Sequence, residues 1–215
     1  MLTTLMLALS AIIAYLLGSV NGSIIISRFL FGQDVRRHGS GNAGLTNFYR
    51  IYGVTGAAGV IAIAALIGGL LLRLAAPEGF EAEFTDTGRV TATFCCILGH
   101  SFPIFYGFRG GKGILTGVSC VFVIDYRAAL IALFIFGVLV AATHYVSLGS
   151  ILSTVSVPVT MVANGFSTRC ILIAAAAVLL IVLRHHENIN RLIHHRESKI
   201  VFKKDISHKI DNDSF

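Results

Sequence analysis

Charged side chains are scarce in this chain of 215 residues, and tryptophan is absent. Asp, Glu, Lys and Arg together make up 13% of the residues, about half the share of roughly 25% that is usual in soluble domains. Hydrophobic residues make up 55% and fill most of the length in long runs. This composition excludes a separate soluble domain and predicts an all-α integral membrane protein, with residues 1–215 as a single membrane-embedded domain.

Cysteine is also rare, and its positions exclude the usual cysteine chemistry. Cys95, Cys96, Cys120 and Cys170 all lie in apolar runs without metal-ligand spacing, which is typical of small buried hydrophobes. The cysteines therefore predict no metal site. The formal net charge of +6 indicates, for a membrane protein, cytoplasmic loops and an anionic partner, with membrane lipid around it and no nucleic acid.

The apolar runs predict about seven transmembrane helices, since about 20 residues span a bilayer. The expected spans cover residues 2–31, 53–76, 90–105, 114–124, 128–143, 148–163 and 170–183. The fourth run is short, so five full spans with two short re-entrant pieces are the alternative. An acidic turn is expected at 77–89, tight turns at 125–127 and 164–169, and a basic tail at 194–215.

Basic residues are distributed unequally between the two sides of this arrangement. On the seven-span arrangement, 13 of the 17 Lys and Arg residues fall on the side that receives the loop at 36–50. Positive charge marks the cytoplasmic side. We therefore predict an N-terminus outside, a C-terminus in the cytoplasm, and glycine-rich loops that all face the cytoplasm.

The most polar of these loops is RRHGSGNAGLTNFYR, at residues 36–50. Its three glycines allow the backbone to approach a ligand closely, and successive N–H groups of such a turn bind anions. Arginines at both ends supply forked, permanently charged donors for phosphate or carboxylate. The density of donors favours an anion site over a flexible loop that only fixes the orientation in the membrane.

Three further polar stretches are expected on the same face. YGFRGGKG, at 106–113, resembles part of a phosphate loop but is not a Walker A sequence, because Tyr106 and Ile114 replace residues that the motif requires. HYVSLGS, at 144–150, and HHENINR, at 185–191, are the other two. The histidines could act as bases or form hydrogen bonds at the interface; their spacing argues against zinc.

Four stretches together resemble one family. GSGNAGLTNFYR, GHSFPIFYGFRGGKG, YVSLGS and HHENINRL followed by RESKI occur in the order found in the bacterial acyl-phosphate:glycerol-3-phosphate acyltransferases, the PlsY family. The resemblance covers nearly the whole chain. It implies a seven-helix enzyme of the bacterial inner membrane that transfers a fatty acyl group from acyl phosphate to the 1-position of glycerol 3-phosphate. The products would be lysophosphatidic acid and phosphate, in the first acylation of phospholipid synthesis.

The resemblance also implies roles for individual residues. The first motif would bind phosphate, the second would hold glycerol 3-phosphate, and Glu197 matches a trailing acid of the last motif. The sequence departs from the family at Asn21, where proline is common, at Leu45, where alanine is usual, and at His144, where arginine is frequent. The implied catalytic residues are Ser40, Arg50, Lys112, Ser147, His185 and Asn188. The implied substrate-binding residues are Gly39, Gly41, Asn42, Gly44, Thr46, Asn47, His100, Gly110, Gly111 and Gly113.

An acyl phosphate is already activated, so on this reading the protein needs no nucleophile of its own, and we expect no metal and no cofactor. It must place the glycerol hydroxyl near the carbonyl carbon and stabilise the developing negative charge. The proton goes either to the acyl phosphate or to a histidine, and the residues favour neither. Partners implied by the reaction are the enzyme that makes acyl phosphate and a second acyltransferase. The alternative function is a membrane carrier of a phosphorylated metabolite or lipid, but we find no internal repeat of the kind that carriers show.

Overall fold

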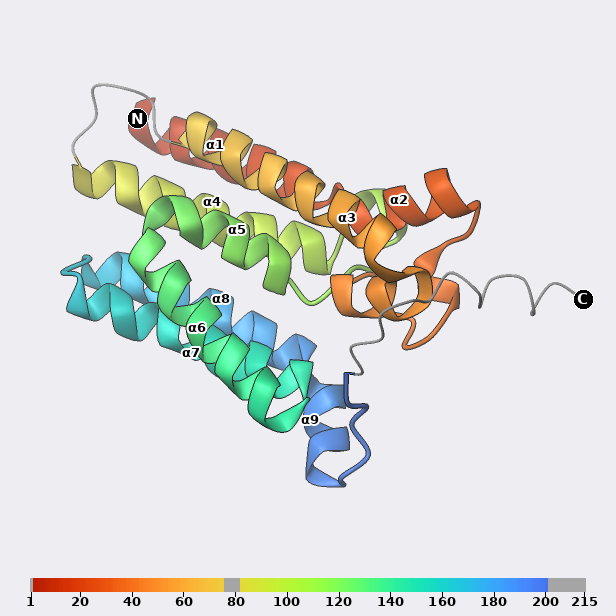
Figure 1. The fold of residues 1–215 in the computed structure, drawn as a ribbon. Coiled ribbons are helices and arrows are strands. Elements are labelled where there is room, and N and C mark those ends of the chain that lie inside the picture. Colours follow the sequence, from red (N-terminus) through yellow and green to blue (C-terminus); the bar gives the residue numbers. More distant parts are fainter. Residues whose placement is uncertain (1, 76–81, 201–215) are drawn as a thin grey trace, which may run out of the picture.

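The computed structural model of the protein describes residues 2–75 and 82–200. Every regular element within these residues is a helix, which confirms the predicted all-α fold. Figure 1 shows α1, α3, α4 and α5 on one side of the molecule and α6, α7 and α8 on the other. The α-helices are α1 (Leu2–Gly18), α2 (Gly22–Phe31), α3 (Leu45–Ala75), α4 (Ala82–Ser101), α5 (Ile114–Ile124), α6 (Tyr126–Thr143), α7 (Val146–Ala163), α8 (Thr168–Arg184) and α9 (His186–Ile193).

The segment 2–31, expected as one span, is broken into α1 and α2. Asn21 causes the break, because its side-chain oxygen accepts a hydrogen bond from the backbone N–H of Ile24 at 3.1 Å and so begins a new helix. Gly32, with φ of 65°, ends that helix. The small polar residues in the middle of this segment therefore redirect the chain toward the first polar loop.

Two other boundaries differ from the sequence expectation. α3 begins at Leu45, inside the stretch expected as loop, because the ring of Phe48 is wholly buried and stabilises a helical turn there; Gly53 interrupts the helix at φ of 72°. α4 begins at Ala82, so part of the expected acidic turn is helical, while residues 76–81 lie outside the described residues. It ends at Ser101 because Pro103 disfavours helical backbone in the residue before it.

The second half of the chain follows its predicted boundaries closely. α5 has the expected bounds, and the expected turn at 125–127 is reduced to one residue. The carboxylate of Asp125 accepts hydrogen bonds from the N–H groups of Arg127 and Ala128 and begins α6 directly. The side-chain amide of Asn164 also donates to Asp125, so the α5–α6 and α7–α8 connections meet.

Glycines allow α1 and α4 to pack closely. A Cβ added at Gly18 would clash with the backbone oxygen of Cys96, and one added at Gly99 would clash with that of Tyr15. Small residues at such crossings let helix backbones approach each other where hydrocarbon surrounds the protein. This contact fixes the end of α4, which carries His100, against the break between α1 and α2.

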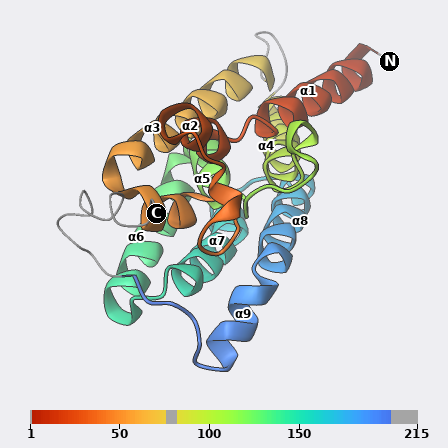
Figure 2. The same cartoon turned by 90° about the vertical axis from the view of Figure 1, so that its right-hand side faces the viewer.

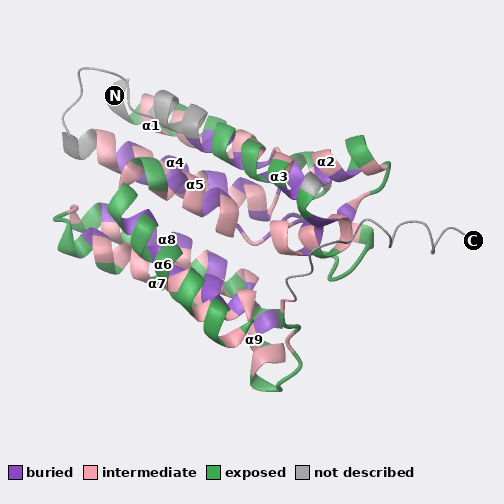
Figure 3. Cartoon of the chain, in the orientation of Figure 1, coloured by how far each residue is buried: buried purple, intermediate pink, exposed green. Residues whose placement is uncertain are grey.

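Only some helical segments are long and apolar enough to cross a membrane, and the first of them combines α1 and α2. Three described segments meet that condition, at Thr4–Phe31, Tyr126–Thr143 and Val146–Ala163, and the pair α8 and α9, bent by 59°, is a fourth candidate. Gly56–Gly68 and Ile114–Ile124 are apolar but shorter. Large apolar side chains are exposed along the outer helix faces, for example Ile12, Phe134 and Leu179, and Figure 3 shows exposed residues along these faces.

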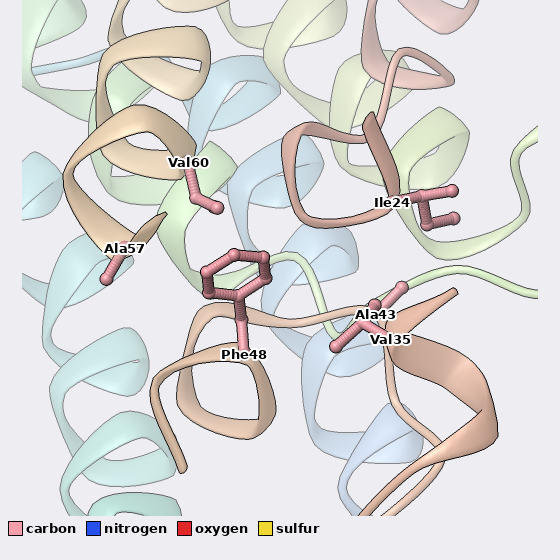
Figure 4. Packing of buried hydrophobic residues seen from close by; sticks show 6 residues of the cluster. All are labelled: Ile24, Val35, Ala43, Phe48, Ala57 and Val60. Atoms are coloured by element: carbon pink, nitrogen blue, oxygen red, sulfur yellow. The ribbon is translucent and has the colours of Figure 1, made fainter. Parts of the chain in front are cut away.

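The polar connections gather at one end of the helices. In Figures 1 and 2 the loop between α2 and α3, the loop between α4 and α5, and α9 all lie at this end. A buried apolar cluster supports the first loop there. Figure 4 shows the ring of Phe48 pointing toward Val60, with Ile24, Val35 and Ala43 nearby, so α2, α3 and the loop share one core.

Candidate active site

A cavity of about 320 Å³ opens where these polar connections meet the apolar helices. All six residues implied to be catalytic line it, as do Asn42, Gly44, Thr46, Asn47, His100 and Gly113. Four of the implied binding residues, Gly39, Gly41, Gly110 and Gly111, do not line it and instead shape the two loops. The structure therefore brings four stretches that are distant in sequence into one site.

The first loop is held together by the side chain of Asn47. Its Nδ2 donates to the backbone oxygens of Val35, His38 and Asn42 at 3.0–3.2 Å, and its Oδ1 accepts from the N–H of Ser40 at 2.9 Å. All the hydrogen bonds of this amide go to the loop backbone. Asn47 therefore shapes the loop that carries Ser40.

Two glycines of the first loop have left-handed backbone conformations. Gly39 and Gly41 have φ of 59° and 69°, and a Cβ at Gly39 would clash with Oδ1 of Asn47. Asn21 contacts the same loop, since its Nδ2 donates to the backbone oxygen of Ala43 at 3.2 Å. The break in the first span is therefore joined to the first loop by a hydrogen bond.

The second loop packs against His100. The N–H of Gly111 donates to the backbone oxygen of His100 at 3.0 Å, and a Cβ at Gly111 would clash with Nε2 of the imidazole. Nδ1 of His100 lies 3.1 Å from the hydroxyl of Thr116, at the start of α5. Glycines at 110 and 111 are required because no side chain fits between the loop and this histidine.

Arg36 joins the first loop to the second. Its Nη1 donates to the backbone oxygens of Tyr106 and Arg109 at 2.8 and 3.0 Å. The carboxylate of Asp34 accepts from Nε and Nη2 of the same guanidinium at 3.0 and 2.7 Å. Because the charged guanidinium donates to it, the pKa of Asp34 lies well below its ordinary value.

Lys112 extends from the second loop into the cavity. Its ammonium group donates to the side-chain oxygen of Asn188, on α9. Burial, with a smaller contribution from the charge of Arg191, lowers the pKa of Lys112 to about 8, although Glu197 and Glu187 act in the opposite direction. Lys112 is therefore mostly cationic at pH 7 but titrates near the alkaline edge of the physiological range.

His185 lies between α8 and α9 and is buried. Its Nδ1 is 2.8 Å from the backbone oxygen of Ile181. A carbonyl oxygen only accepts hydrogen bonds, so Nδ1 carries a proton and Nε2 is the nitrogen that is able to accept one. This tautomer suits a histidine that receives a proton from a substrate.

Glu197 is the acidic residue of the cavity wall. Its Oε1 accepts from the hydroxyl of Ser147 at 2.8 Å and from Nδ2 of Asn188 at 2.7 Å, and its Oε2 accepts from Nε of Arg191 at 2.7 Å. Burial raises the pKa of Glu197, but these hydrogen bonds lower it by more, so its pKa lies below the ordinary value. The carboxylate thus orients two residues that the family resemblance implies to be catalytic.

The segment that carries Glu197, residues 196–200, crosses the edge of the site. Nη2 of Arg50 donates to the backbone oxygen of Ser198 at 3.2 Å, and the N–H of Ile200 donates to the backbone oxygen of His144 at 2.8 Å. The ammonium of Lys199 lies 5.5 Å from the ring centre of Tyr145. The start of the predicted basic tail is therefore part of the site.

The other wall of the cavity is apolar. Residues of α2, α3, α5, α6 and α7 form it, and they continue directly from the polar end of the cavity. Its lining residues include Val20, Ser23, Leu45, Val60, Ile63, Ala64, Ile67, Ile114, Leu115, Thr116, Val118, Ala132, Leu133, Phe136, Val146, Ser150 and Ser153. One cavity therefore presents cationic and amide donors at one end and hydrocarbon at the other.

Sequence reasoning missed three polar residues of the site. Arg191 lines the cavity, Asn21 holds the first loop, and Arg184 donates to the second loop. Arg184 and Arg191 lie close to the HHEN motif in the sequence, and this position could have marked both arginines as candidate site residues. Among residues 2–75 and 82–200, no three His, Cys, Asp or Glu side chains are grouped to hold a metal ion.

Comparison with known proteins places the chain among acyltransferases. The family model described as glycerol-3-phosphate acyltransferase matches residues 8–195. The chain is 36% identical over 198 residues to a glycerol-3-phosphate acyltransferase from Thermoanaerobacter sp. (strain X514), covering 92% of this chain and 98% of that protein. It is 40% identical over 197 residues to one from Endomicrobium trichonymphae, covering 90% and 96%.

Solved structures are similar over the same length. One is a crystal structure of PlsY (YgiH), an integral membrane glycerol 3-phosphate acyltransferase, in its glycerol 3-phosphate form. The two chains are 33% identical with a TM-score of 0.82, and 91% of this chain and 96% of that chain are covered. The lysophosphatidic acid form of PlsY is 32% identical with a TM-score of 0.79, covering 91% and 95%.

Proposed function

The chain belongs to the glycerol-3-phosphate acyltransferase family, and we propose that it transfers a fatty acyl group from acyl phosphate to the 1-position of glycerol 3-phosphate. The products are lysophosphatidic acid and phosphate. The observation that carries this proposal is the single cavity that joins cationic and amide donors to an apolar wall. A substrate with a phosphate at one end and a hydrocarbon chain at the other matches that division.

We assign roles to the residues of the cavity in a direct acyl transfer that uses no enzyme nucleophile. Ser40, Asn42 and Gly44 of the first loop line the cavity together with Arg50 and Lys112, and we assign to Arg50 and Lys112 the stabilisation of negative charge on the phosphate and the carbonyl oxygen. His100 and Lys112 of the second motif would hold glycerol 3-phosphate, and Glu197 orients Ser147 and Asn188 in the same cavity. The hydroxyl oxygen attacks the carbonyl carbon as the bond to the phosphate oxygen breaks, and the proton passes to the departing phosphate or to Nε2 of His185.

We place the chain in the bacterial inner membrane as one domain, with about seven spans and the site facing the cytoplasm. Residues of the four polar motif stretches meet in one cavity at one end of the helices, and most basic residues of the sequence are expected on that side, which supports this placement. The site also lies at a helix end and not in mid-membrane, which favours interfacial chemistry over a carrier. The enzyme that makes acyl phosphate and a second acyltransferase act before and after it.

The test is phosphate release by purified protein in lipid, supplied with palmitoyl phosphate and glycerol 3-phosphate. We expect release to require both substrates, to yield lysophosphatidic acid, and to fall at least about a hundredfold in Lys112→Ala and Asn188→Ala, as for loss of a charged group that stabilises a transition state. Arg169→Gln is the control, since Arg169 is exposed near the start of α8, whereas the site residues lie beyond its other end. Folded wild-type protein that turns over neither acyl phosphate nor acyl-CoA would refute the proposal.

A further inference from the structure

Arg184 is the last residue of α8, and its guanidinium group donates hydrogen bonds to backbone oxygens of the second loop. Its Nε and Nη2 both donate to the oxygen of Gly111 at 3.3 Å, and Nη2 also lies 3.5 Å from that of Gly110. The guanidinium carbon is 5.0 Å from the ring centre of Phe102. Stacking on the ring and a fork of donors fix the plane of the guanidinium group, which a lysine in its place would not reproduce.

These contacts act on the residue that precedes Lys112. The N–H of Gly111 donates to the backbone oxygen of His100, and the carbonyl oxygen of Gly111 accepts from Arg184, so both backbone polar groups of the residue before Lys112 are held. Gly110 and Gly111 are buried and have no side chains to move. The direction in which the Lys112 side chain leaves the backbone therefore depends on Arg184.

The same helix end sets the partner of Lys112. α8 ends at Arg184, His185 follows, and α9 then places Asn188 against the Lys112 ammonium group. Arg184 is not part of the cavity wall. It therefore connects the two members of the Lys112–Asn188 pair without reaching the cavity itself.

We infer that Arg184 is a positioning residue, which sets Lys112 against Asn188 by holding the carbonyl of Gly111. Its charge has a second effect, because it lowers the pKa of Lys112 along with burial and Arg191. Arg184→Gln removes both the fork and the charge, whereas Arg184→Lys keeps the charge and loses the fork. The pair of variants therefore separates geometry from electrostatics.

The experiment measures kcat and KM for glycerol 3-phosphate in wild type, Arg184→Gln, Arg184→Lys and Arg169→Gln. Each variant of Arg184 is also combined with Lys112→Ala. We expect kcat/KM to fall roughly tenfold in Arg184→Gln and several-fold in Arg184→Lys, as for loss of hydrogen bonds from a charged group. In the Lys112→Ala background, the same changes should cost less than about twofold, because a residue that acts through Lys112 has nothing left to position.

Three results would overturn the inference. Equal losses in both backgrounds would show that Arg184 acts independently of Lys112, and full activity in Arg184→Lys would show that only its charge matters. A lowered unfolding temperature with unchanged kcat/KM per folded molecule would show a purely structural role. The inference rests on the proposed function, and the experiment tells their failures apart. If wild type and Arg169→Gln are both inactive, the proposed function fails. If wild type, Arg169→Gln and Arg184→Gln are equally active, only the positioning role of Arg184 fails.

Discussion

Glu197→Gln tests whether the acid at the edge of the site both holds the tail in place and supports the charge of Lys112. A glutamine keeps an oxygen that is able to accept from Ser147 and Asn188. Its amide nitrogen would then face Nε of Arg191, which is also a donor, so the hydrogen bond at 2.7 Å is lost. The change is nearly isosteric, so the effect arises from charge and hydrogen bonding and not from packing.

The size of the effect on stability follows from exposure. A hydrogen bond between charged groups contributes about 1.5–3 kcal/mol, but the Arg191 side chain is 35% exposed whereas that of Glu197 is 5% exposed. We therefore discount the loss for solvent screening to about 1–2 kcal/mol. For a chain of this length, that lowers the unfolding temperature by about 2–8 °C, measured by a fluorescence melt in detergent.

The same substitution changes the pH profile. Glu197 raises the pKa of Lys112, which burial has lowered to about 8. Removing the carboxylate lowers that pKa further, so the alkaline limb of kcat/KM should move to lower pH. Initial rates of phosphate release between pH 6 and about pH 10 give the limb; the range covers the pKa of Lys112 in the folded protein and approaches that of a free lysine.

Glu187→Gln is the matched control. Glu187 carries the same charge on α9 but its side chain is 65% exposed, and its oxygen lies 3.8 Å from Arg191. Its removal should leave the unfolding temperature within about 1 °C, as for an exposed ion pair, and should move the limb less. An alkaline limb that stays in place or moves to higher pH in Glu197→Gln would refute the electrostatic reasoning.

Three further outcomes are expected. The wild-type rate should fall as pH rises through about 8, because Lys112 then loses its proton in the folded protein. Over the same range the contribution of Lys112 to the free energy of unfolding should rise, because the unfolded chain binds more protons at this lysine than the folded chain. Initial rates and chemical denaturation, measured over one pH series, compare the two effects. Gly111→Ala should lower activity at least tenfold because its Cβ clashes with His100, whereas Gly137→Ala, with no atom within 4 Å of the new Cβ, should match wild type in the same assay. Asn21→Ala removes the cap of α2 and its hydrogen bond to the first loop, so we expect a loss of about 1 kcal/mol in stability and a raised KM for glycerol 3-phosphate, measured by denaturation and by initial rates.

The sequence allowed the apolar helices of the second half to be predicted well, because their ends are marked locally. Asp125 and Ser167 are N-capping residues, and the bounds of α5 follow directly from the glycine before it and the acid after it. Such signals act within one helical turn and need no knowledge of the fold. The first half was harder because its boundaries depend on tertiary packing: α3 starts early where Phe48 enters a core built from α2 and the first loop.

The residues of the site also fall into two groups, those that the sequence allowed to be predicted and those that it did not. Residues that reach the cavity, such as Lys112 and Asn188, belong to polar motifs in an apolar sequence and were therefore predictable as candidates. Residues that hold those motifs in place were not, because Arg184 and Asn21 act on backbone oxygens, and the sequence does not say which carbonyl an arginine or asparagine will meet. Intermediate cases such as Asn47 have a side chain that lines the cavity while all its hydrogen bonds go to the loop.

The charges of the cavity explain why its polar end suits a phosphate. Arg50, Lys112 and Arg191 line it, and Glu197 is the single acidic residue among the lining residues that the structure describes. Burial is the main reason why the pKa of Lys112 is lowered, and the positive charges of Arg191 and Arg184 add to it. An anion bound between Lys112 and the first loop offsets the excess positive charge, raises the pKa of Lys112 and so favours the protonated lysine. The arrangement that makes Lys112 sensitive to alkaline pH would therefore also favour a substrate with negative charge, as we propose for this site.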